Sequence, residues 1–154
     1  MSEVNMEMAK NVFESACAAL DAMDIKYKKV EDDLVILFGH RGQDMNHELL
    51  LAVNARQEAI QLIERLPFEI EADKARDVAC AVCLVNDRIL AGSFTFDMES
   101  RLSYEVTQLY SGSLIGEETI KRMIIALVIT VEEYDDKFMA LNKGYVTVDE
   151  FKRD

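Results

Sequence analysis

The sequence predicts an α+β fold, in which helices pack on an antiparallel sheet. Two observations indicate this fold. Residues 89–97 and 102–110 alternate between apolar and polar side chains, as the two strands of a hairpin do. A long helical segment follows, and its residues 123–131 are apolar on nearly every side. With the elements before the hairpin, the predicted order is helix, strands, helix, two strands, helix.

The composition is that of one globular domain. The chain has 154 residues, of which 50% are hydrophobic and 30% charged. It contains one proline and six glycines, and no stretch has the composition of a linker. We therefore expect a single domain over residues 1–154, with a core at about 5–141 and a short tail at 142–154.

The net charge of the chain limits the classes of partner that it can bind. It has 17 Lys and Arg against 29 Asp and Glu, a formal net charge of −12. Such a surface repels nucleic acids and anionic membranes, so neither is expected as a partner. The first residues do not resemble a signal peptide, and residues 123–131 are too short to span a bilayer. With three cysteines and no export signal, we expect a cytoplasmic location with reduced thiols.

The first half of the chain predicts one helix and three strands. Residues 5–23 form the helix, with Asn5 as its cap. Its apolar stripe recurs at three- and four-residue steps: Met6, Ala9, Phe13, Ala16, Leu20 and Met23. Strands are predicted at 25–31, 34–39 and 48–54. The second strand is apolar at nearly every position, so we expect both of its faces to be covered.

Residues 56–66 fit two structures. Ala59, Ile60, Ile63 and Leu66 have helical spacing, whereas Ile60, Leu62 and Glu64 would lie on one face of a strand. The turn-like residues 54–57 favour a hairpin strand. Pro67 is expected to end either element.

Two further helices are predicted. Residues 73–85 form the first, capped by Asp73, with an apolar side made of Ala75, Val78, Ala79, Val82 and Cys83. The second runs over 117–141, and Ile125, Val128 and Ile129 are apolar outside its main stripe. A helix that is apolar all round must be buried all round. Either the sheet curls about it, or a second subunit covers it, so we expect a homodimer.

Taken in order, several segments resemble a known family. They are the run 60–68, the helix ending at Asn86, the stretch 90–94 with Gly92-Ser93-Phe94, the strand through Tyr104, and the last helix with Tyr134. Over about residues 25–140 the chain resembles the YbjN-like family of bacterial sensory transduction regulators. The resemblance implies a type III secretion chaperone-like fold, and it supplies no catalytic residues. Likeness to chaperones in fold does not establish chaperone activity.

Cys80 and Cys83 form a C-x-x-C pair, which could bind zinc or cycle as a disulfide. Structural zinc needs four ligands, and Cys17, His40 and His47 lie at irregular spacing. A redox pair usually opens a helix, whereas this pair lies within one. We therefore favour two small buried hydrophobic residues, since free cysteine is among the most buried residue types.

Other polar groups are interpreted as solvated. His40 and His47, with Asp44, could form a weak metal site or an acid/base pair, but solvated loop histidines are favoured. The acidic runs 31–33 and 132–136 are likewise interpreted as exposed charge.

The tail resembles half of a calcium loop if Gly144 is its glycine. Met139, Leu141 and Lys143 would then occupy positions that need oxygen ligands, so calcium is excluded. The tail is expected to pack through Tyr145 and Phe151.

The sequence contains no phosphate loop, no G-x-S-x-G and no H-E-x-x-H. We therefore assign no catalytic, cofactor-binding or metal residues and expect no cofactor. The favoured function is a non-catalytic protein-interaction module, adaptor or chaperone-like, that binds a protein partner or a partner segment by strand addition or in a groove. The alternative is a small-molecule or metal-binding regulatory protein, and an enzyme of unrecognised type is less favoured.

Overall fold

Strands with one apolar face build a six-stranded antiparallel sheet. The structure, a computed structural model, describes residues 4–153. Its strands are β1 Tyr27–Val30, β2 Val35–Arg41, β3 Asn46–Asn54, β4 Ala59–Glu69, β5 Ser93–Phe96 and β6 Arg101–Leu109. Their order in the sheet is β1-β2-β3-β4-β6-β5. Its helices are α1 Met6–Ala22, α2 Ala75–Asn86, α3 Glu117–Asn142 and α4 Val148–Phe151, with the 3-10 turns η1 Glu31–Asp33 and η2 Ala72–Lys74. The predicted α+β class is confirmed.

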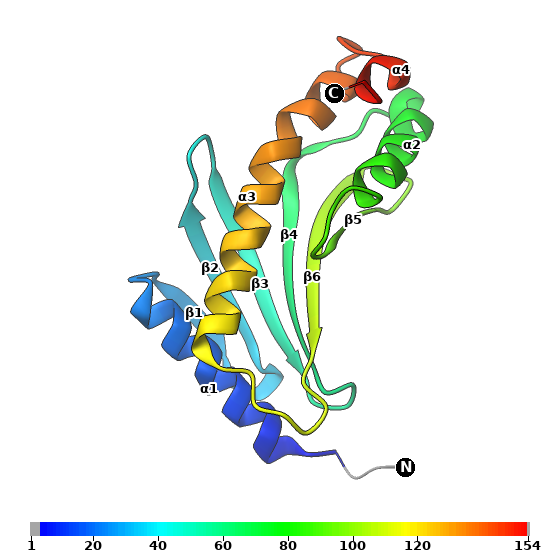
Figure 1. The fold of residues 1–154 in the computed structure, drawn as a ribbon. Coiled ribbons are helices and arrows are strands. Elements are labelled where there is room, and N and C mark those ends of the chain that lie inside the picture. The colour runs from blue at the N-terminus through cyan, green and yellow to red at the C-terminus, as the bar shows by residue number, and fades with distance from the viewer. Residues whose placement is uncertain (1–3, 154) are drawn as a thin grey trace.

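The three longer helices form one layer on one face of the sheet, and α3 crosses the middle of it (Figure 1). The register aligns Phe38, Leu49, Glu64 and Tyr104 in one row across β2, β3, β4 and β6. All four side chains are buried, so this row lies on the inner face, beneath the helices. A carboxylate thus occupies a core position in a central strand.

The first helix agrees with its prediction. The Asn5 side chain accepts a hydrogen bond from the Met8 N–H at 2.9 Å, which satisfies a free amide of the first turn. Ala9, Phe13 and Leu20 of the predicted stripe are buried, whereas Met6 at the open end is exposed.

Residues 59–69 form the hairpin strand β4, so the favoured prediction of a strand in this segment is correct. The prediction that Pro67 ends the strand is wrong. The strand continues to Glu69 because the register with β6 shifts between Arg65 and Glu69. Such an irregularity accommodates a residue that cannot donate a ladder hydrogen bond.

The expectation that β2 is covered on both faces is also wrong. Ile36 and Phe38 are buried, but Leu37 is 43% exposed and Val35 only partly covered. The helices all lie on the inner face, so the outer face of the sheet remains open.

The strand predicted at 89–97 is shorter, because β5 begins at Ser93. Gly92 has φ +81°, a left-handed conformation, and a Cβ there would come 2.5 Å from the carbonyl oxygen of Glu105. The extended chain breaks at this point, and Leu90 before it is fully exposed rather than part of an apolar strand face.

Asparagine side chains hold the ends of strands. Asn86, the last residue of α2, bonds both the N–H and the carbonyl of Phe94 in β5, at 2.8 and 2.9 Å. Asn142, the last residue of α3, bonds the Glu69 carbonyl and the Glu71 N–H in the same way. The expected cap at Asp73 is not formed, because η2 precedes α2 and its N-cap residue is Lys74.

The third helix is not buried all round. Val128 is buried, but Ile125 is 47% and Ile129 is 60% exposed on the side away from the sheet. Beyond this helix Phe151 packs into the core as predicted, whereas Tyr145 is exposed, contrary to expectation. Within residues 4–153, no helix is long and apolar enough to cross a membrane.

Candidate functional site

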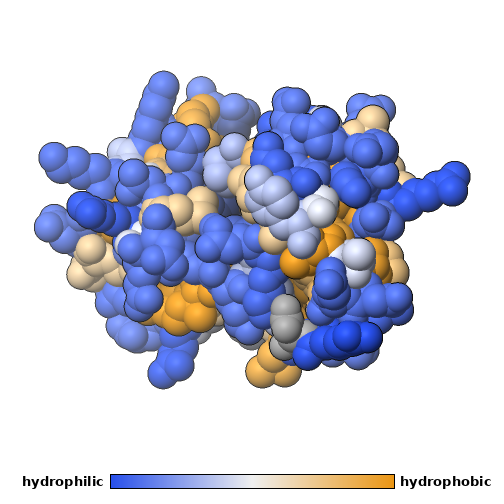
Figure 2. All heavy atoms as spheres, turned by 90° about the horizontal axis from the view of Figure 1, so that it is seen from above, coloured by the Kyte–Doolittle hydropathy of each residue, from blue (hydrophilic) through white to orange (hydrophobic). Residues whose placement is uncertain are grey.

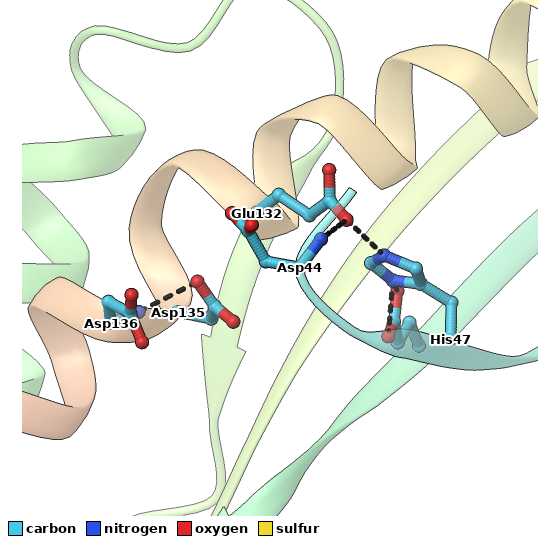
Figure 3. A network of polar contacts seen from close by, with 6 residues as sticks. Asp44, His47, Glu132, Asp135 and Asp136 are labelled. Carbon is cyan, nitrogen blue, oxygen red and sulfur yellow. Dashed lines mark hydrogen bonds and ion pairs between the residues drawn. The ribbon is translucent and has the colours of Figure 1, made fainter. Parts of the chain in front are cut away.

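A buried polar cluster joins the sheet to α3. His47 lies on β3, two residues before Leu49 and on the same inner face. Its Nδ1–H donates to both carboxylate oxygens of Glu64 on β4, at 2.8 and 2.9 Å. Its Nε2–H donates to Oε1 of Glu132 on α3 at 3.3 Å. Figure 3 shows the imidazole beside Glu132, and the hydrogen bonds place it between this carboxylate and that of Glu64.

The geometry suits a protonated His47. Both ring nitrogens face carboxyl oxygens, and an imidazolium donates at both positions. Burial alone would lower the pKa of His47, but Glu64 and Glu132 outweigh it and the pKa lies above its ordinary value. Because the side chain of Glu64 is only 1% exposed, the pair is a core ion pair rather than a surface one.

Glu132 also fixes the turn between β2 and β3. Its Oε1 accepts a hydrogen bond from the Asp44 N–H at 3.1 Å (Figure 3). Burial tends to raise the pKa of Glu132, but this N–H and His47 hold it below the ordinary value. Gly42 faces the same carboxylate so closely that a Cβ would overlap it. One side chain of α3 therefore holds both the turn and the histidine.

The prediction of two solvated loop histidines is wrong for His47. His40 lies opposite it in the β2–β3 register and is partly buried, and this burial together with the charge of His47 lowers the pKa of His40. Asp44 contributes its backbone and not its carboxylate. Within residues 4–153, no three or more His, Cys, Asp or Glu side chains are placed to hold a metal.

The acidic runs divide into two kinds. Residues 31–33 are exposed, as predicted. Glu132 and Asp135 instead face inward, and burial raises the pKa of Asp135, so the prediction of a solvated run is wrong for these two. Glu64 and Glu132 are the site residues that sequence reasoning missed. The available signal was that Glu64 shares a strand face with Ile60 and Leu62.

The cysteines also differ from expectation. Cys80 and Cys83 are free and exposed, so the prediction that they are small buried hydrophobic residues is wrong. The buried stripe of α2 is Val78, Ala81, Val82 and Val85, and both thiols lie outside it. Cys17 on α1 is partly buried, and this burial raises the pKa of its thiol.

The outer face of the sheet carries an aliphatic row. Leu37, Leu50 and Ile63 stand opposite one another on β2, β3 and β4. They line a shallow hollow of about 580 Å³, bordered by Glu48 and Arg65. At the end of the molecule that carries α4, by contrast, most of the surface is hydrophilic, with small hydrophobic areas between the polar residues (Figure 2). The outer row is a candidate surface for an apolar partner.

A second hollow, of about 400 Å³, lies between α1 and the β1 end of the sheet. Phe13, Cys17 and Leu34 supply apolar walls, and Lys10 and Lys29 supply positive charge. Lys29 is paired with Glu31 at 2.6 Å. This hollow combines apolar and charged groups, as small-molecule sites do.

Comparison with known proteins identifies relatives. Residues 16–140 match the YbjN family, described as "Putative bacterial sensory transduction regulator". The crystal structure of YbjN from E. coli, called "a putative transcription regulator", is similar, with a TM-score of 0.59 and 10% sequence identity. The alignment covers 80% of this chain and 91% of that chain. At this identity the likeness shows the fold alone. No curated protein matches the chain.

Proposed function

The chain belongs to the YbjN family, and from that premise we propose that it is a non-catalytic regulatory module that acts by binding another protein. The match over residues 16–140 confirms the family resemblance seen in the sequence. The family description is that of a regulator and names no reaction.

One observation carries the proposal: the outer face of the sheet is open along the row Leu37, Leu50 and Ile63. The three longer helices pack on the other face (Figure 1), and Leu37 remains 43% exposed. Removing aliphatic surface from water is favourable by about 25 cal/mol per Å², and the costs of association offset part of this gain in a complex. Leu50 and Ile63 are only partly covered within the fold, so a partner would cover the rest of the row.

The buried cluster supports a structural role over a catalytic one. Both nitrogens of His47 are already hydrogen bonded to carboxylates, so neither is free to take a proton from a substrate. Among the residues that the structure describes, no Ser, Thr or Cys side chain bonds to His47 as a nucleophile would. The cluster instead joins β3, β4 and α3 and keeps the sheet in shape.

The test is affinity capture from the organism's own lysate with three forms of the purified protein. Wild type should retain one protein near stoichiometry. Leu37→Lys should lose it, because it places a charge in the aliphatic row. Ile129→Lys, the matched control on the exposed side of α3, should keep it. Loss with Ile129→Lys alone would move the interface to α3, and no captured protein with wild type would refute the proposal.

The hollow between α1 and the sheet favours a small-molecule regulator as the second candidate function. If this candidate is correct, native mass spectrometry of the wild-type protein should show an added mass from a non-covalently bound small molecule. Ala18→Trp, which fills the hollow from α1, should remove that mass. Wild type without any added mass would refute this candidate.

The proposal also includes a homodimer, a cytoplasmic location and a protein partner. A homodimer through the exposed Ile125 and Ile129 would cover the apolar side of α3. The cytoplasmic location rests on the reduced state expected for three free thiols. The net charge of −12 argues for a protein partner and against a nucleic acid.

A further inference from the structure

Two thiols lie exposed one turn apart on α2. Cys80 and Cys83 are both free and on the solvent side of the helix. The core of α2 is made by Val78, Ala81 and Val85, which are fully buried. Neither thiol is therefore needed for packing, and both are accessible to a reagent in solution.

Their spacing is within reach of a disulfide. An α-helix with 3.6 residues per turn, a rise of 1.5 Å and a Cα radius near 2.3 Å places the Cα atoms of residues i and i+3 about 5 Å apart. Disulfides span roughly 4.4–6.8 Å between Cα atoms. The Cβ atoms start about 5–6 Å apart and must approach to about 4 Å, so the turn has to tighten locally. Strain of this kind makes a disulfide easier to reduce.

We propose that Cys80 and Cys83 are a reversible dithiol–disulfide site, oxidised by low-molecular-weight disulfides. The thiolate of one cysteine attacks a sulfur of oxidised glutathione, breaks its S–S bond and releases one glutathione thiolate, which takes up a proton. The second cysteine attacks the mixed disulfide, forms the Cys80–Cys83 bond and releases the second glutathione. The protein loses two protons and two electrons, the equivalent of two hydrogen atoms, and one glutathione disulfide becomes two thiols.

The site is coupled to the edge of the sheet. The carbonyl of Cys83 accepts a hydrogen bond from the Asp87 N–H at 3.3 Å, at the end of α2. Asn86, in the same turn, holds both backbone groups of Phe94 in β5. Tightening the turn at 80–83 shifts this end of the helix, so oxidation loosens the attachment of β5.

The test is intact-protein mass spectrometry after incubation with oxidised glutathione. Wild type should lose two hydrogens and retain no glutathione. Cys80→Ser and Cys83→Ser should each retain one glutathione, because the second attack is impossible. Cys17→Ser, the control at the partly buried thiol, should behave as wild type does. Wild type that keeps glutathione without losing two hydrogens, or that links into disulfide dimers, would overturn the proposal.

Hydrogen exchange tests whether oxidation of Cys80 and Cys83 loosens the attachment of β5. In the oxidised protein, the Phe94 amide should exchange faster, and reduction with dithiothreitol should restore the slow rate. Both cysteine variants should show the slow rate under oxidising and reducing conditions alike. An oxidised wild type with unchanged exchange at Phe94 would refute the coupling to β5.

Discussion

Replacing His47 by Leu tests whether the buried cluster acts as an ion pair. The substitution keeps a side chain of similar size and removes the cation that faces Glu64. The carboxyl group of Glu64 then remains on the inner face of β4 with 1% exposure and no positive partner. Breaking a buried ion pair from one side typically costs about 3–5 kcal/mol.

The cost is limited by protonation of Glu64, and this limit depends on pH. Neutralising a carboxyl group with an ordinary pKa of 4.5 costs about 3.4 kcal/mol at pH 7, at 1.36 kcal/mol per pH unit. The same step costs about 2 kcal/mol at pH 6 and about 0.8 kcal/mol at pH 5. The loss of stability in His47→Leu should therefore be smaller at pH 5 than at pH 7. The difference is less than these costs alone, because the raised pKa values of His47 and Glu64 also stabilise the wild type as the pH falls.

The assay is urea unfolding at pH 5, 6 and 7, with the free energy of unfolding obtained by linear extrapolation. The double variant His47→Leu/Glu64→Leu is the matched control. It removes both charges, and its stability should lie within about 1 kcal/mol of wild type at pH 7. An equal loss for the single variant at pH 5 and pH 7 would show a packing defect and refute the ion-pair reasoning. A double variant as unstable as the single one would refute it too.

Three further predictions concern His47, Gly42 and the exposed side of α3. Because the folded pKa of His47 is raised, its stabilisation is complete below pH 6.5 and is lost as the pH rises through that pKa; His47→Gln should lack this decline in urea unfolding. Gly42→Ala should cost about 1–2 kcal/mol by displacing the Glu132 carboxylate and crowding the ring of His47. The cost should fall in a Glu132→Ala background, where only the crowding of His47 remains, as a double-mutant cycle would measure. Ile125→Asp or Ile129→Asp should convert a dimer into a folded monomer in light scattering. If both variants stay folded and dimeric, the interface lies elsewhere.

The periodicity of the sequence predicted most of the fold because each main element has one apolar face. Alternation identified β6 and the strands around it, and three- and four-residue spacing identified α1 and α3. The errors came where backbone geometry overrides pattern. Gly92 turns the chain before β5, and the register shift between Arg65 and Glu69 carries β4 past Pro67.

The candidate site could not be predicted because it depends on register and on tertiary contact. His47 and Glu64 are 17 residues apart, and only the pairing of Leu49 with Glu64 brings them together. Glu132 lies in an acidic run whose composition indicates solvent exposure. Its inward position follows from the packing of α3 on the sheet, which brings it to His47. Cys80 and Cys83 were predicted to be buried because free cysteine is buried on average. The buried stripe of α2, which contains Val78 and its neighbours, excludes both residues.

The polar contacts at the rim of the sheet bear on how a partner would bind. Strand addition at β5 would have to displace Asn86, which already bonds both backbone groups of Phe94. The opposite edge, β1, is short and carries the exposed Lys28 and Lys29, features that discourage pairing with another strand. Both edges are thus protected, while the aliphatic row on the outer face is not. A partner that uses this sheet is therefore expected to pack against its face, with apolar side chains in the hollow beside Leu37, rather than to extend it by a seventh strand.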